Sequence, residues 1–252
     1  MGLDDLRLPP LRLRPAAAGA GAGGGAGARH PRPSPRARPA RGAGHAAPLP
    51  RAARLPTQER FVNVIDALLA RRSVSPRVVR DPGPNDAELN LILSAGARAA
   101  DHGRMRPWRF ILVQGAARVR LGEVFAACRR RRDPTANDAE IDKERAKPLR
   151  APLVIAVAAH VVAGHATVRA VDQVHAAAAA AQNILLACFA LGFGAMWLTG
   201  SNAHDPNVKR ALGLAATDEI VGFLYVGSID APPEPLPVED LAANVVEWTG
   251  PA

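Results

Sequence analysis

The stretch ILSAGARAADHGRMRPWRFILV, residues 92–113, places the end of a helix, a basic loop and a strand in succession. The helix begins earlier, because Asn85 followed by Glu88 has the spacing of a capping box and apolar residues then recur on one side to about Arg98. After the loop, the β-branched and aromatic run at residues 108–113 predicts a buried strand. The chain therefore combines helices and strands.

Further elements alternate along the chain. We expect buried strands at residues 153–159 (LVIAVAA) and 219–226 (EIVGFLYV), and an extended segment at 195–198. The expected helices run from a cap at Thr57 to about residue 71, from 116 to about 130, from 172 to 191, and from Asp205-Pro206 to Leu212. The charged stretch 129–150 predicts a mobile loop. Strands separated by helices make the class α+β or α/β, and the pattern alone leaves the strand order open.

The expected helix at residues 172–191 is almost without charge. The uncharged run 176–198 is long enough to span a bilayer, but its alanines, amides and glycines lower the gain of transfer into lipid. We therefore favour a helix that is buried inside protein and partly covered by a second subunit. The Pro-rich arm 232–252 has no core of its own, and we expect it to pack on that second subunit.

Composition separates the first 57 residues from the rest. They hold ten Arg and two Asp, which is +8 of the formal net charge of +9, together with nine Gly, ten Pro and no aromatic residue. Such a composition cannot bury enough apolar surface to offset chain ordering, so we expect a disordered extension. We divide the chain into this extension (1–57), one folded domain (58–231) and the C-terminal arm (232–252).

The basic extension has three further interpretations. It is Arg-rich and poor in acids, as mitochondrial presequences are, but Ser34 is its only serine and its prolines break helices. Its arginines could contact phosphates of a nucleic acid, although no aromatic residues are interleaved with them. It could also be an over-extended reading frame. The broken apolar pattern of residues 6–13 argues against a secretory signal, and we expect a cytoplasmic protein.

Three clusters could carry chemistry. Arg71-Arg72-Ser73 follows a helix and offers two guanidinium groups and a hydroxyl, which suit a phosphate, although Arg at a helix end also offsets the helix dipole. The loop 98–108 places Arg98 and His102 between a helix and a strand, where a solvated turn with Asp101 capping His102 is the alternative. The segment 191–200 (LGFGAMWLTG) lets backbone approach a ligand closely, or is a tight turn into a strand.

The sequence shows no residue pattern typical of metal binding, hydrolysis or disulfide chemistry. His160, His165 and His175 lack further ligands at suitable spacing, so we expect no metal. Hydrolase motifs and closely spaced carboxylate pairs are missing from the folded part. Cys128 and Cys188 lie far apart without a CxxC spacing, which suits a reducing compartment.

With these clusters the chain resembles the nitroreductase family of flavoproteins, and most closely its small NAD(P)H nitroreductase branch. The likeness covers roughly residues 67–227. It rests on five strings that occur in the family's order. They are ARRSVS (70–75), ILSAGARAADHGRMRPWRFILV (92–113), RAPLVIAV (150–157), LGFGAMWLTG (191–200) and IVGFLYVG (220–227). The resemblance implies an α+β fold with a mixed sheet flanked by helices, as an intertwined homodimer with two FMN sites at the interface.

The resemblance also implies roles for single residues. Arg71, Arg72 and Ser73 would hold the phosphate and ribityl end of FMN, and Arg98 and His102 would reach the flavin from the neighbouring subunit. Trp197, Leu198 and Thr199 would lie along the cofactor. The chain departs from the family pattern at Ala99-Ala100, where Ala-Pro is common, at Arg106, where Gln is usual, and at Leu198, where the close branch often has Arg.

The implied function is an FMN-dependent oxidoreductase that takes hydride from NADH or NADPH and reduces nitroaromatics, quinones or similar acceptors by ping-pong turnover. No protein side chain is then needed as a catalytic residue, because the flavin N5 carries the chemistry and a nearby cation, Arg98 or His102, stabilises the reduced ring. Alternatives are other flavin chemistry, such as dehalogenation or flavin fragmentation, and a basic-tailed nucleic-acid-binding module on a degenerate flavin fold. We expect a homodimer that binds a small-molecule acceptor, with no metal, membrane or nucleic-acid partner.

Overall fold

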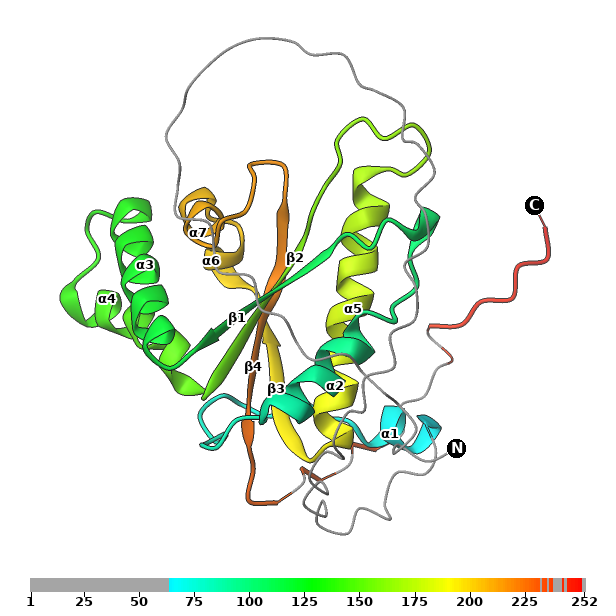
Figure 1. The fold of residues 1–252 in the computed structure, drawn as a ribbon, viewed down its shortest axis with the longest axis horizontal. Helices are drawn as coiled ribbons and strands as arrows, with labels where there is room; N and C mark the ends of the chain where they lie inside the picture. The colour runs from blue at the N-terminus through cyan, green and yellow to red at the C-terminus, as the bar shows by residue number, and fades with distance from the viewer. Residues whose placement is uncertain (1–63, 232, 235, 238–241, 243, 251–252) are drawn as a thin grey trace, which may run out of the picture. The chain divides into compact units, whose positions relative to one another are not determined.

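The computed structural model describes residues 64–231 and, in the C-terminal arm, residues 233–234, 236–237, 242 and 244–250. The expected cap at Thr57 and the extension 1–57 lie outside the described residues. Within them, helices and strands alternate along the whole domain (Figure 1). The elements, in order, are α1 (Val64–Ala70), α2 (Asp86–Gly96), η2 (His102–Arg104), β1 (Trp108–Gln114), α3 (Ala116–Arg132), α4 (Asp138–Arg145), η3 (Lys147–Arg150), β2 (Leu153–Ala159), α5 (Ala170–Ala190), β3 (Phe193–Leu198), α6 (Gly200–Ala203), α7 (Pro206–Ala211) and β4 (Glu219–Ser228).

The four described strands form one sheet in the order β1-β2-β4-β3. All three pairings are antiparallel. The α+β class with helices flanking a sheet is therefore confirmed, and the described sheet is antiparallel rather than mixed. Strands β1 and β2, and likewise β3 and β4, are each joined by a helical segment and lie side by side, whereas α5 carries the chain from β2 past β4 to the edge strand β3.

Helices cover both faces of the sheet, with α3 and α4 on one side and α2 and α5 on the other (Figure 1). Strand β2 shows the consequence, because all seven of its residues are buried. Its side chains alternate between two cores, as the period of a strand requires. Val154 and Ala156 join the core beneath α3, and Leu153, Ile155 and Val157 join the core beneath α2 and α5. An uncharged central strand is the expected result of covering both faces.

The capping box predicted at Asn85 is confirmed. The Asn85 side chain accepts a hydrogen bond from the Glu88 amide, and the Glu88 side chain accepts one from the Asn85 amide. Gly96 at the end of this helix allows close packing, since an added Cβ would lie 2.7 Å from Ile184 of α5. Helix α2 is thereby fixed against α5.

The expectation of a mobile loop at residues 129–150 was wrong. This stretch continues α3 to Arg132 and then forms α4 and η3. Asn137 and Glu140 form a second capping box at the start of α4. Ile141 is the buried residue of α4, which packs against α3. The charges that suggested a loop instead form ion pairs between α3 and α4, among them Arg129 with Glu140 and Arg145 with Glu123.

Helix α5 has the length and composition of a membrane span. In the structure one stripe of it is buried against α2 and the sheet, and that stripe is Gln173, Ala176, Ala177, Ala180, Ala181, Ile184, Leu185 and Cys188. The side chains between these positions are mostly half-buried. The packing supports a core helix, and only one face of it is fully covered by its own chain.

Helix α1 forms where the apolar spacing predicts it, but its own chain does not bury its apolar face. Val64, Ile65, Leu68 and Leu69 are all exposed, and α1 has no buried residue. Val245, Val246 and Trp248 in the C-terminal arm are exposed as well. Large exposed apolar patches are typical of sites where proteins associate with other molecules.

Candidate functional site

The predicted phosphate cluster lies beside the edge strand β3. Residues 71–73 follow directly after α1, and the Val74 amide then donates a hydrogen bond to the Ala195 carbonyl at 2.9 Å. The Ser73 side chain is exposed, and Arg72 donates to the Glu234 carbonyl of the C-terminal arm. The structure therefore brings the first and third predicted clusters together at one strand.

The end of β3 is shaped by an irregularity in β4. Val157 of β2 pairs with Gly222 and Ala158 pairs with Ile220, so Val221 is left over as a bulge. The Val221 carbonyl accepts a hydrogen bond from Trp197 Nε1 at 3.1 Å. Gly222 provides the space for this indole, because an added Cβ would lie 2.5 Å from Trp197 Cδ1 and closer still to Nε1. Bulges commonly re-aim side chains next to functional sites.

Beyond Trp197 the chain borders a cavity of about 350 Å³. The cavity lies over the face of the sheet that α3 covers, and it has the size of a small-molecule site. Its wall consists of Phe125, Lys147, Arg150, Trp197, Leu198, Thr199, Gly200, Ser201, Asn202, Phe223 and Tyr225. Three of the predicted residues, Trp197, Leu198 and Thr199, therefore line one cavity.

Sequence reasoning missed the cations of this cavity. Lys147 and Arg150 come from η3, which lay in the stretch expected to be a loop. Lys147 forms an ion pair with Glu144. Burial would raise the pKa of Glu144, but hydrogen bonds from Lys147 and Asn202 outweigh it and lower that pKa, so the carboxylate stays charged.

Tyr225 was also missed, since it lies inside an apolar strand. It is 3% exposed, and no hydrogen bond of its hydroxyl is found among the described residues. Every buried side-chain oxygen or nitrogen of the described residues has a partner, so this unpartnered hydroxyl is accessible, and the space that Tyr225 borders is the cavity. Burial raises the pKa of Tyr225 to about 12, which keeps the hydroxyl a hydrogen-bond donor at physiological pH.

Arg98 and His102 lie elsewhere in the same chain. Arg98 is exposed just after α2, and His102 Nδ1 is 4.0 Å from Asp172 Oδ2 in the first turn of α5. His102 thus lies at the start of α5. Residues 71–74 lie beside the start of β3, which follows the end of α5, and this helix is about 30 Å long. Among the described residues no hydrogen bond or ion pair joins the two groups. One chain alone therefore does not assemble all eight predicted residues.

The loop that carries His102 has an unusual backbone. Gly103, Arg104 and Arg106 all have positive φ, which costs free energy for the two arginines. Asp101 does not cap His102. Its Oδ2 accepts a hydrogen bond from the Arg106 amide at 2.6 Å instead. Such strain persists only where the surrounding structure holds it, and it is commonly found at ligand sites.

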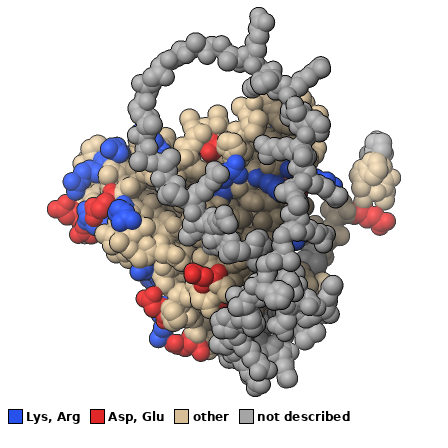
Figure 2. All heavy atoms as spheres, viewed as in Figure 1, with Lys and Arg blue, Asp and Glu red and all other residues tan. Residues whose placement is uncertain are grey.

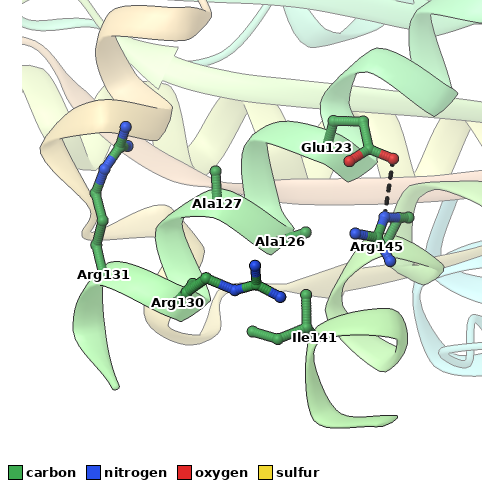
Figure 3. Close-up of a pocket in the computed structure, with 7 residues that line it drawn as sticks. All are labelled: Glu123, Ala126, Ala127, Arg130, Arg131, Ile141 and Arg145. Atoms are coloured by element: carbon green, nitrogen blue, oxygen red, sulfur yellow. Dashed lines mark ion pairs between the residues drawn. The ribbon is translucent and has the colours of Figure 1, made fainter. Parts of the chain in front are cut away.

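A second cavity, of about 380 Å³, lies on the outer side of α3 and contains none of the predicted residues (Figure 3). Arg130 extends over Ile141, whereas Arg131 points away from it, and Arg145 is paired with Glu123. Arg130 also pairs with Asp138. Figure 2 shows the same mixture of opposite charges over α3 and α4. Three of the predicted residues line the cavity beside β3 and none lines this one, so the cavity beside β3 is the better candidate.

The three histidines considered for metal binding do not form a site. His160 Nδ1 lies 2.9 Å from Asp218 Oδ1, while the His165 ring accepts hydrogen bonds from nearby backbone amides. No group of three or more His, Cys, Asp or Glu side chains that could hold a metal occurs among the described residues.

Comparisons with known proteins bear on the family and on the fold. A family model described as the Nitroreductase family matches residues 68–228. The protein YdjA of Escherichia coli strain K12, whose name proposes an NAD(P)H nitroreductase, is 37% identical over 172 residues, which are 66% of this chain and 88% of YdjA. YfhC of Bacillus subtilis strain 168, named in the same way, is 27% identical over 171 residues, which are 67% of this chain and 86% of YfhC.

Two solved structures illustrate the fold. A nitroreductase-like protein from Bacillus cereus has a TM-score of 0.65 at 22% identity and covers 77% of this chain and 100% of its own. A protein from Desulfovibrio desulfuricans, named as a proposed nitroreductase and solved in complex with FMN, has a TM-score of 0.55 at 26% identity. It covers 75% of this chain and 98% of its own.

Proposed function

The chain belongs to the nitroreductase family, and from this premise we propose that it is an FMN-dependent oxidoreductase. It takes hydride from NADH or NADPH and reduces a nitroaromatic, a quinone or a similar small acceptor. The observation that carries the proposal is the cavity at the end of β3. Three predicted residues line it, and the phosphate cluster lies beside the same strand, next to Ala195. The two cysteines of the chain are free and buried, which suits the reducing cytoplasm that we infer as its location.

The residues of this cavity fit a flavin. Phe125, Phe223 and Leu198 would give a flat ring apolar contacts, while Lys147 and Tyr225 would donate hydrogen bonds to its polar atoms. Gly200 has a positive φ, and an added Cβ there would meet no atom within 4 Å, so the backbone is open toward a ligand. From Ala195 to Thr199 a strand advances about 13 Å, which is within the length of an extended FMN when its ring and its ribityl phosphate are taken together.

Each group has a role in this proposal. When bound, FMN supplies a hydride acceptor at its N5 atom. Arg71 and Arg72 bind the phosphate through charge-assisted hydrogen bonds, and Ser73 adds a hydroxyl. The Lys147 ammonium, which lines the cavity, would stabilise negative charge on a flavin held there. Within one chain, Lys147 thus takes the role that the sequence suggested for Arg98 or His102.

We also propose a homodimer. The exposed apolar face of α1 and the exposed Trp248 of the C-terminal arm are surfaces that a second copy would cover. A second copy would also bring Arg98 and His102 to a cavity that they do not reach within their own chain. The half-buried side of α5 supports the same arrangement.

The test is cofactor release from the purified full-length protein, followed by chromatography. We expect FMN, a yellow protein with a flavin absorbance band, and oxidation of NADH or NADPH when an acceptor is present. Arg71→Ala and Ser73→Ala should each lower FMN affinity by about 1.5 to 3 kcal/mol, while Arg77→Ala in the following turn serves as the control. Colourless protein that binds no added FMN would refute the proposal, and a screen of nitroaromatics, quinones and halogenated aromatics would identify the acceptor class.

A further inference from the structure

A line of hydrogen bonds runs from the last residue of α3 to the cavity. Arg132 pairs with Asp205, the N-cap of α7, and also donates from its second terminal nitrogen to Asn202 Oδ1 at 2.9 Å. Asn202 Nδ2 donates to Glu144 Oε2 at 3.0 Å. The other oxygen of Glu144 accepts from Lys147, which lines the cavity. One guanidinium is thus connected to the cavity ammonium through two side chains.

The middle of this line is shielded from water, whereas the Lys147 side chain at its end is 33% exposed. Asp205 and Asn202 are 5% and 4% exposed, and the side chains of Glu144 and Arg132 are 15% and 28% exposed. Burial raises the pKa of Asp205, but the Asn207 amide and Arg132 outweigh it, so that the pKa is lowered and the carboxylate stays charged. Two cations and two carboxylates balance one another, and a network of this kind resists rearrangement when every member has a partner.

Arg132 differs from its three neighbours in the run of four arginines that ends α3. Arg129 pairs with Asp133 and Glu140, and Arg130 pairs with a largely exposed Asp138. Arg131 has no ion pair or hydrogen bond among the described residues. Surface ion pairs such as those of Arg129 and Arg130 contribute little to the free energy of unfolding. Only Arg132 bridges two buried side-chain acceptors, Asp205 and Asn202, which uses the forked geometry of a guanidinium and which a lysine cannot reproduce.

We propose that Arg132 is a positioning residue for the reaction, acting through Asn202 and Glu144 to hold the Lys147 ammonium and the 199–202 backbone in place at the cavity. This inference rests on the proposed function, because it assigns Lys147 to the flavin site. Arg132 itself does not line the cavity. Its effect on turnover is therefore indirect and depends on Lys147.

Amine labelling tests the position of Lys147 without any cofactor. The chain has three lysines, Lys143, Lys147 and Lys209, and Lys143 is an exposed internal reference on α4. Competitive acylation of the full-length protein, read by mass spectrometry, gives the Lys147:Lys143 ratio. We expect this ratio to rise about tenfold in Asn202→Leu and Arg132→Gln, as one hydrogen bond to a charged group is lost. Arg131→Gln is the matched control and should leave it unchanged.

Arg132→Lys separates positioning from stability. The lysine keeps a charge opposite Asp205, so we expect its thermal unfolding to stay close to that of the parent protein. It cannot also hold Asn202, so the labelling ratio should still rise. If Arg132→Gln does not fold, Asn202→Leu and Arg132→Lys still decide the question. An unchanged ratio in the folded variants overturns the proposal.

The flavin reaction supplies the second measurement. The rate of flavin reduction by NAD(P)H should fall about ten- to a hundredfold in Asn202→Leu and Arg132→Lys, because small misplacements at a reacting centre are costly. In a Lys147→Met background the same changes should produce no further fall. Additive effects, or unchanged rates despite a changed labelling ratio, overturn the proposal. A protein that binds no flavin refutes the proposed function and with it the effect on turnover, while labelling still reports separately whether Arg132 holds Lys147.

Discussion

Gly222→Ala is expected to damage the fold and the site together, because of one contact. The added Cβ would lie 2.5 Å from Trp197 Cδ1, where carbon atoms normally remain about 3.5 Å apart, so the indole must shift by about 1 Å. This shift breaks the 3.1 Å hydrogen bond from Trp197 Nε1 to the Val221 carbonyl. Overpacking typically costs about 1 to 3 kcal/mol, and the lost hydrogen bond about 0.5 to 1.5 kcal/mol. The free energy of unfolding should fall by about 1.5 to 4.5 kcal/mol.

The assay is urea or thermal unfolding, together with FMN titration. A domain of this size loses roughly 2 to 4 °C in melting temperature per kcal/mol. Gly83→Ala is the matched control, because its added Cβ would lie at an ordinary 3.5 Å from Pro152 and its φ is not positive. Trp197→Leu should relieve the clash, so the double variant with Gly222→Ala should be closer in stability to Trp197→Leu alone. A Gly222→Ala protein as stable as Gly83→Ala would show that the indole does not occupy this space.

Three further predictions concern single groups. Tyr225→Phe should weaken FMN or acceptor binding about 2- to 12-fold, which is one neutral hydrogen bond, and equal affinities in titrations would show that the hydroxyl touches neither. The pKa values of Glu144 and Asp205 are lowered in the folded protein, so the unfolded state binds more protons in acid. The free energy of unfolding should therefore be at its full value at neutral pH and should fall below about pH 4. Urea midpoints against pH measure this, and Glu144→Gln should flatten the profile. Burial raises the pKa of Cys188 to about 12, so a thiol reagent should label it only on unfolding, and rapid labelling of native protein would contradict its burial.

Much of the fold follows from local signals in the sequence. Strand β2 agrees with its apolar run residue for residue, and α2 starts at the capping box that Asn85 and Glu88 announce. The same local signal was present at Asn137 and Glu140, where α4 begins. It was overlooked because the surrounding charges resemble a solvated loop. Those charges are satisfied by partners on α3, which a reading along the chain does not show.

The candidate site was predicted only in part, for a related reason. Trp197 and Thr199 lie on a segment whose glycines attract notice, whereas Lys147 and Tyr225 reach the same cavity from elements distant in sequence. Tyr225 is one polar group in an apolar strand, and no periodicity distinguishes it. Sequence alone also gives no way to tell Arg132 from the three arginines before it. Only tertiary packing gives that residue two buried acceptors.

Strand β2 also has a consequence for synthesis on the ribosome. Its native partner β4 begins about 60 residues after β2 ends, so one edge of an uncharged strand lacks its neighbour until nearly the whole domain has been translated. At about 5 to 20 residues per second this interval lasts roughly 3 to 12 s. Unpaired apolar edges of this kind are prone to intermolecular pairing. The nascent chain is therefore expected to depend on chaperones until β4 has emerged.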